Sequence, residues 1–195
     1  SLFTLSLTTG DKKQLTAPVR DQIAPAFAAG KPVYVQKRSL QRKGVAAAEL
    51  KPLITIEDRK LVVYSGSGRK VLDPIGNDAS YIWPSFSPDG TKLVFTVAGR
   101  GTYVTNADGK NPVSLGYLNA PAWLGSGWVI GMDDRDDGGR VVESTLWAVN
   151  VNGKVRQQLT TPDKGIFMYP AASADGRRIA FNSDRVSLLI SPVTN

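Results

Sequence analysis

The chain has 195 residues and a formal net charge of +7, with 24 Lys or Arg against 17 Asp or Glu. It contains no Cys and no His, which excludes disulfides, thiol nucleophiles, imidazole acid–base catalysis and a Ser-His-Asp triad within this chain. No run of about 18 apolar residues predicts a membrane-spanning helix. The chain opens at Ser1 inside a predicted strand and without a signal peptide, so a mature, trimmed product or a fragment is expected.

The first 72 residues predict two kinds of strand pair. Residues 1 to 16 place an apolar strand, a turn at Gly10 and a second strand in succession. Residues 24 to 35 predict a hairpin around Gly30, and residues 53 to 72 return to β-branched and apolar residues with a turn at Gly68. We therefore expect residues 24 to 72 to form one blade-like sheet.

The stretch from Gln36 to Pro52 interrupts this pattern. It carries five Lys or Arg against one Glu, and its longest helical pattern, residues 46 to 50, is too short to be stable alone. We expect a long loop here, and long loops in compact domains are often functional. The basic residues are Lys37, Arg38, Arg42, Lys43 and Lys51.

Residues 82 to 115 contain the clearest unit. Trp83 to Ser87 predicts a half-buried strand, Pro88-Asp89-Gly90 a tight turn with Asp89 as its cap, and Thr91 to Val97 the returning strand. Residues 103 to 115 add two strands around a turn at Gly109. These roughly 34 residues therefore predict four antiparallel strands.

Two further copies follow. Residues 120 to 160 repeat the unit, with an acidic loop expected at residues 133 to 139 and a turn at Gly153. Residues 169 to 193 repeat the hairpin, with Asp175-Gly176 in its turn, and add a third strand. The turn glycines 10, 68, 109 and 153 are separated by 58, 41 and 44 residues. Four strands per roughly 40 to 50 residues predict an all-β chain, a β-propeller of four-stranded antiparallel blades.

The repeated motif resembles a known family. Pro-x-Phe-Ser-Pro-Asp-Gly-x-Lys-Leu-Val-Phe, followed by Asn106-Ala107-Asp108-Gly109, is similar to the WD-like repeat of the TolB-like β-propellers. The resemblance implies a propeller, six-bladed in that family, over residues 1 to 195 as one domain. About four blades are covered, so the chain is either a small complete ring or part of a six-bladed ring.

The resemblance also implies a function. Relatives of this kind act by protein–protein contact in the bacterial envelope, so we expect a non-catalytic module that binds a protein or peptide in the periplasm, with no cofactor. The alternative is the gating propeller of a prolyl-oligopeptidase-type peptidase without its catalytic domain. Nucleic acid is disfavoured as a partner, because the basic residues are dispersed and the aromatic residues fall on strands.

The variable loops predict where a partner binds, because binding residues are often on loops held by a rigid frame. An arginine follows the second strand of each blade. It either caps a strand end or pairs with a nearby carboxylate such as Asp134 or Asp184, or it belongs to a ring of guanidinium groups suited to carboxylates or phosphates. The acidic run either binds calcium, which its spacing and Arg135 disfavour, or is a solvated loop. The candidate partner-binding residues are Arg38, Arg42, Lys43, Arg100, Arg135, Arg185, Asp134 and Asp136.

Overall fold

The structure is a computed structural model that describes residues 1–18, 22–184 and 189–192. The chain forms two compact units. The first unit is Ser1–Glu57 with Val62–Val71, and the second is Asp58–Leu61 with Leu72–Asn195. The prediction of a single domain over residues 1 to 195 stays a prediction.

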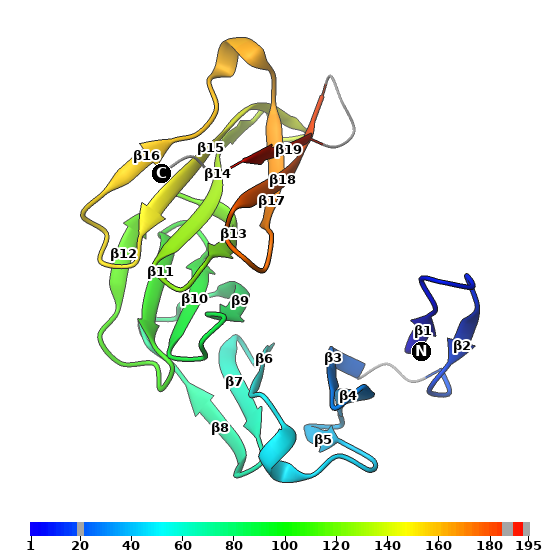
Figure 1. Cartoon of the computed structure of the whole chain (residues 1–195). Coiled ribbons are helices and arrows are strands. Elements are labelled where there is room, and N and C mark those ends of the chain that lie inside the picture. The colour runs from blue at the N-terminus through cyan, green and yellow to red at the C-terminus, as the bar shows by residue number, and fades with distance from the viewer. Residues whose placement is uncertain (19–21, 185–188, 193–195) are drawn as a thin grey trace. The chain divides into compact units, whose positions relative to one another are not determined.

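All strands belong to antiparallel sheets, as the sequence predicts (Figure 1). Six sheets are present in the described part of the chain, and the strands of each follow one another in sequence. The early sheets are β1 (Phe3–Leu5) and β2 (Lys12–Gln14); β3 (Gln22–Ala28), β4 (Lys31–Gln36) and β5 (Ser39–Gln41); and β6 (Leu53–Glu57), β7 (Lys60–Ser65) and β8 (Gly68–Leu72).

The remaining three sheets lie in the second unit. They are β9 (Tyr81–Phe86), β10 (Lys92–Val97), β11 (Gly101–Asn106) and β12 (Val113–Gly116); β13 (Asn119–Leu124), β14 (Trp128–Asp136), β15 (Val141–Asn150) and β16 (Arg156–Gln158); and β17 (Phe167–Ala172), β18 (Arg178–Ser183) and β19 (Leu189–Pro192). Two short 3₁₀ helices, η1 (Ala47–Glu49) and η2 (Pro162–Lys164), complete the described elements.

One prediction about the basic stretch was wrong. Gln36 to Pro52 is not a long loop, because residues 39–41 form β5, which pairs with β4, and residues 47–49 form η1. Residues 24 to 72 accordingly form two three-stranded sheets instead of one. The strand was missed because β5 has three residues, and only Leu40 among them is apolar.

The acidic loop was also placed wrongly. Asp133 to Asp136 continue β14, with Asp134 paired to Ser144 and Arg135 to Glu143 on β15. Only residues 137–140 turn the chain. The strand extends because backbone pairing across the long β14–β15 hairpin satisfies the main chain, whatever the charge of the side chains.

The tight turns match their prediction closely. The Ser87 hydroxyl donates to Asp89 Oδ1 at 2.6 Å, and the same oxygen accepts from the Thr91 backbone N–H at 3.0 Å. Gly90 has φ 73° and donates to the Ser87 carbonyl at 2.8 Å. The β17–β18 turn repeats these contacts with Ser173, Asp175 and Gly176.

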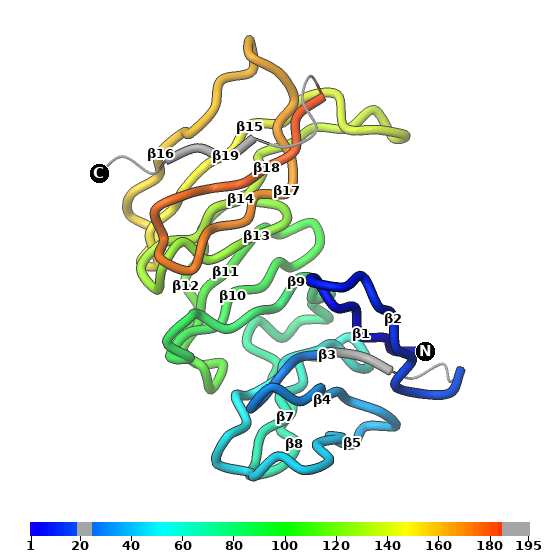
Figure 2. Tube along the Cα trace, turned by 45° about the vertical axis from the view of Figure 1, so that its right-hand side comes forward, coloured from blue at the N-terminus to red at the C-terminus, as the bar shows by residue number. Residues whose placement is uncertain are grey.

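The core of the second unit lies between sheets. Successive residues of β14 face opposite ways, so Val129 packs toward β9–β12 and Ile130 toward β17–β19. Both residues are fully buried. The sheet β13–β16 therefore packs against β9–β12 with one face and against β17–β19 with the other, and Figure 2 shows the course of these strands. A strand buried on both faces explains the near-continuous apolar run Trp128 to Met132.

A polar contact is repeated between these layers. The buried Thr102 hydroxyl on β11 donates to the Leu118 carbonyl just before β13, and the buried Ser144 hydroxyl on β15 donates to the Phe167 carbonyl at the start of β17. Each contact joins the third strand of one sheet to the first strand of the next. Both carbonyls are thereby satisfied away from water.

The first strand of four sheets carries a proline at a bulge. The register shifts at Ala24-Pro25, Trp83-Pro84, Ala120-Pro121 and Tyr169-Pro170. Proline has no N–H to donate to a neighbouring strand and is therefore confined to edge strands or bulges. Each of these prolines lies at a bulge in an edge strand. Trp83, Ala120 and Tyr169 have φ of 50°, 45° and 52°, which side chains rarely adopt.

Replacing Thr102 with Val tests the contact between layers. The change keeps the side-chain shape and leaves the Leu118 carbonyl without this donor, so we expect the free energy of unfolding to fall by about 1–3 kcal/mol. Ser144→Ala should act in the same direction through Phe167. Urea unfolding of both variants measures the effect, and wild-type stability in both would refute the role of these hydroxyls.

Replacing Ala120 with Gly tests the strain at the bulge. A left-handed conformation costs an L-residue about 1–2 kcal/mol, whereas Gly in an ordinary strand position costs about 0.5–1 kcal/mol relative to Ala. We therefore expect Ala120→Gly to be neutral or stabilising by up to about 1 kcal/mol. Ala122→Gly, two residues along β13, is the matched control and should destabilise. Equal losses in both variants would show that the bulge holds no strain.

Candidate partner-binding site

The predicted basic residues of the first unit lie around the β4–β5 turn and the segment after β5. Arg38 is in the turn with φ 57°, and its side chain is 61% exposed. Its Nε lies 3.7 Å from Glu57 Oε2. Arg42 donates through Nη1 to the Val45 carbonyl at 3.2 Å, and Lys43 is exposed. These three cations are close in sequence and lie in one unit.

Glu57 pairs through its carboxylate with two arginines of the first unit. Its side chain is only 7% exposed, and besides Arg38 it pairs with Arg69 Nη2 at 2.7 Å. The Tyr64 hydroxyl also donates to it. Burial raises the pKa of Tyr64, and Glu57 adds to the shift, so the phenol stays protonated and remains a donor.

Two of the other predicted arginines, Arg100 and Arg135, have partners within the second unit. Arg100, in the β10–β11 turn, donates to the Asn77 carbonyl at 2.8 Å. Arg135 lies within β14 and pairs with the carboxylate of Glu143 on β15 at 3.1 Å. Arg185 lies outside the described residues. The contacts of Arg38, Arg100 and Arg135 are those of residues that cap a strand end or pair with a carboxylate.

The two predicted aspartates differ in environment. Asp134 is half-buried and accepts from Asn119 Nδ2 at 2.9 Å. Burial raises the pKa of Asp134, and the charges of Asp133 and Asp136 add to the shift. Asp136 accepts from the Gly138 N–H at 2.8 Å in the turn. Among the described residues no group of three or more acidic side chains is arranged to hold a metal ion.

Two features of the first unit were not foreseen. The first is its charge: this unit holds eleven Lys or Arg against four Asp or Glu, a net charge of +7, whereas the second unit holds thirteen of each. The whole excess of positive charge therefore belongs to the first unit. A charge count per segment signals this, but only once the boundary between the units is known.

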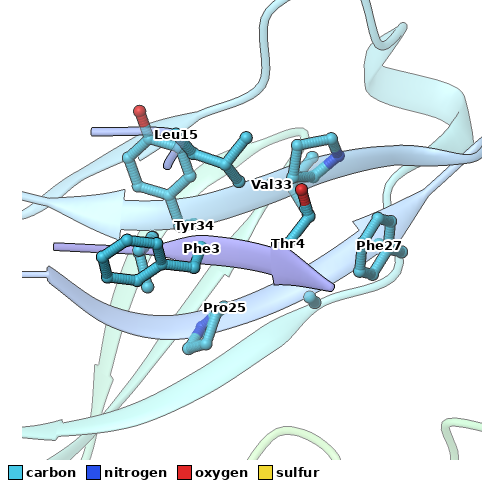
Figure 3. A pocket seen from close by; sticks show the side chains of 10 residues that line it. Phe3, Thr4, Leu15, Pro25, Phe27, Val33 and Tyr34 are labelled. Atoms are coloured by element: carbon cyan, nitrogen blue, oxygen red, sulfur yellow. The ribbon is translucent and has the colours of Figure 1, made fainter. Parts of the chain in front are cut away.

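The second unforeseen feature is an apolar cleft in the first unit (Figure 3). Its volume is about 280 Å³. Strands β1, β3 and β4 and the residue after β2 contribute its walls, which include Phe3, Leu15, Pro25, Phe27, Val33 and Tyr34. Phe3 is 46% and Phe27 68% exposed. No sequence signal predicts this cleft, because it joins segments from different sheets.

Solved structures share this fold. TolB from Acinetobacter baumannii is similar over 70% of this chain and 35% of its own, with 16% identity and a TM-score of 0.54. A prolyl endopeptidase is similar over 90% of this chain and 27% of its own, with 21% identity and a TM-score of 0.57. An oligogalacturonate lyase in complex with manganese is similar over 92% of this chain and 51% of its own, with 13% identity and a TM-score of 0.54.

These similarities define the class of fold. The chain has a TolB-like β-propeller fold, all-β and built of small antiparallel sheets. It spans between about a quarter and a half of the length of these three structures. No protein-family model and no curated protein sequence matches it. No helix in the described part of the chain is long and apolar enough to cross a membrane.

Replacing Asp134 with Asn tests its environment. The pKa of Asp134 is raised in the folded state, so the folded protein binds this proton more tightly and loses stability as pH rises above the ordinary value of 3.8. Asn keeps an acceptor for Asn119 without the charge, so we expect a higher melting temperature than wild type at pH 7 and no gain at pH 3.

Asp89→Asn is the contrasting control. The hydrogen bonds from Ser87 and Thr91 lower the pKa of Asp89, so its contribution is present at neutral pH and is lost as pH falls below about 3.8. This variant should melt below wild type at pH 7. Thermal melts at both pH values measure the two effects. A change in melting temperature of the same sign for both variants at pH 7 would contradict the opposite pKa shifts assigned to Asp134 and Asp89.

Proposed function

We propose that this chain is a non-catalytic binding module whose first unit recognises an acidic protein or peptide partner. The observation that carries the proposal is the segregation of charge, with a net charge of +7 on the first unit and none on the second. Complementary charge steers association and selects partners more than it adds affinity. Arg42 and Lys43 are the exposed cations that we assign to this surface.

The chemistry of the chain supports a binding role. With no His and no Cys, the chain supplies neither an imidazole base nor a thiol nucleophile. The carboxylates of Asp89 and Asp175 accept hydrogen bonds that hold turns, and they lie on separate hairpins. The resemblance to TolB-like repeats leads us to propose the periplasm as its location, which fractionation of the native cell would test.

A second candidate function is favoured by one observation. The chain is similar to a prolyl endopeptidase over 90% of its length, at 21% identity. A propeller attached to a peptidase domain would serve the chemistry of that domain. The coding sequence on either side of this chain decides between the two, because a Gly-x-Ser-x-Gly motif with later Asp and His codons would favour the peptidase.

Charge reversal tests the proposed function. We expect Arg42→Glu with Lys43→Glu to slow association of the full chain with poly-L-glutamate several-fold at about 50 mM salt and less at about 200 mM, because salt screens exposed charges. Stability should change by no more than about 1 kcal/mol. Stopped-flow fluorescence with a labelled polymer measures the association rate.

The matched control reverses two exposed lysines of the second unit. Lys154→Glu with Lys164→Glu changes the total charge of the chain by the same amount. Association of this variant should remain within about twofold of wild type. An equal loss in both double variants would assign the binding to overall charge and overturn the role of the first unit.

A further inference from the structure

The apolar cleft has the size of a pocket for one side chain. Pockets that enclose a drug-sized ligand have volumes of about 300–1,000 Å³, and this cleft has about 280 Å³. Figure 3 shows Phe3, Pro25 and Phe27 around it. One large apolar side chain of a peptide, placed in a matching pocket, is the usual anchor of a protein interface.

Lysines lie next to residues that line the cleft. Lys12 Nζ lies 4.2 Å from the centroid of the Phe3 ring, which forms part of the wall. Lys13 is the next residue along β2, and Lys31 directly precedes the lining residue Pro32. Lys31 Nζ donates to the Gly44 carbonyl at 2.7 Å, which holds its charge near β4 and keeps further N–H donors available. An apolar cleft with lysines beside its lining residues complements an apolar side chain flanked by carboxylates.

A strand edge next to the cleft offers main-chain groups. β1 pairs only with β2 among the strands that the structure describes, whereas β3, which is also an edge strand, carries the bulge at Pro25. Unpaired N–H and C=O groups at an edge such as that of β1 accept an extended peptide as an added strand. The cleft, the lysines beside its lining residues and the edge of β1 therefore favour the same kind of occupant.

We propose that the cleft binds an extended acidic peptide segment, with one aromatic side chain inserted beside Phe27 and carboxylates against Lys12, Lys13 and Lys31. This inference rests on the proposed function and gives its partner a specific chemistry. The inserted aromatic side chain supplies most of the affinity by burying apolar surface. The lysines set the orientation of the bound peptide and increase its rate of association.

Two labelled peptides test the proposal with the full chain. The first peptide is Asp-Glu-Asp-Phe-Asp-Glu-Asp, and the second has Ser in place of Phe. Burying one aromatic side chain changes affinity by about tenfold or more, so the Phe peptide should bind at least about tenfold more tightly by fluorescence anisotropy. Lys12→Glu with Lys13→Glu should weaken the Phe peptide at least about fivefold at low salt.

Phe27→Ser is the decisive variant. Phe27 is 68% exposed, so its loss should leave the melting temperature almost unchanged while removing the advantage of the Phe peptide over the Ser peptide. Tyr169→Ser, which removes a 58% exposed aromatic ring from the second unit, is the matched control and should bind both peptides as wild type does.

The possible outcomes separate this inference from the proposed function. Equal affinity for the two peptides overturns the cleft as the anchor site, while the proposed function stands if poly-L-glutamate binding still depends on Arg42 and Lys43. Absence of binding to both peptides and to the polymer overturns both proposals. Binding to phosphatidylglycerol vesicles that Phe27→Ser abolishes, without peptide binding, assigns the cleft to a membrane surface and overturns the peptide.

Discussion

Contact between the faces of successive sheets is the constraint on which the second unit depends. Val129 and Ile130 are neighbours in β14 and bury against different sheets. Neither could be buried if β13–β16 were alone, because a single sheet leaves one or both faces in water. The hydroxyls of Thr102 and Ser144 add direction to this apolar contact, since each bonds to a carbonyl at the start of the next sheet. Each of these sheets therefore depends on the adjacent sheet for the burial of its apolar side chains.

Local chemistry made much of this fold predictable. Pro88-Asp89-Gly90 encodes its turn through interactions within six residues, and the matching turn at Asp175 forms in the same way. β5 escaped prediction because a strand of three residues carries too little pattern, and the extension of β14 escaped because charged side chains at its end concealed the backbone pairing with β15. The local sequence predicts turns well, whereas the residue at which a strand ends depends on its partner strand.

The candidate site was predictable only in part. Arg42 and Lys43 stand in the basic stretch from which the site was expected, and the structure places them in the strongly basic unit. Arg100 and Arg135 were chosen by their position in the repeat, and both have partners that a repeat position could not reveal. The apolar cleft could not be foreseen, because Phe3 and Phe27 come together only when different sheets pack. Side-chain partners and clefts that depend on which residues are neighbours in space cannot be predicted from the order of residues along the chain.

The prolines at the bulges have a consequence for solubility. β3, β9, β13 and β17 each end their sheet, and an exposed strand edge is a template on which another chain can pair and start an aggregate. Pro84, Pro121 and Pro170 each remove one N–H from such an edge, and the bulge beside each proline breaks the regular spacing that a pairing strand would need. The strained residues before these prolines thus help to keep an architecture rich in open edges from joining to copies of itself.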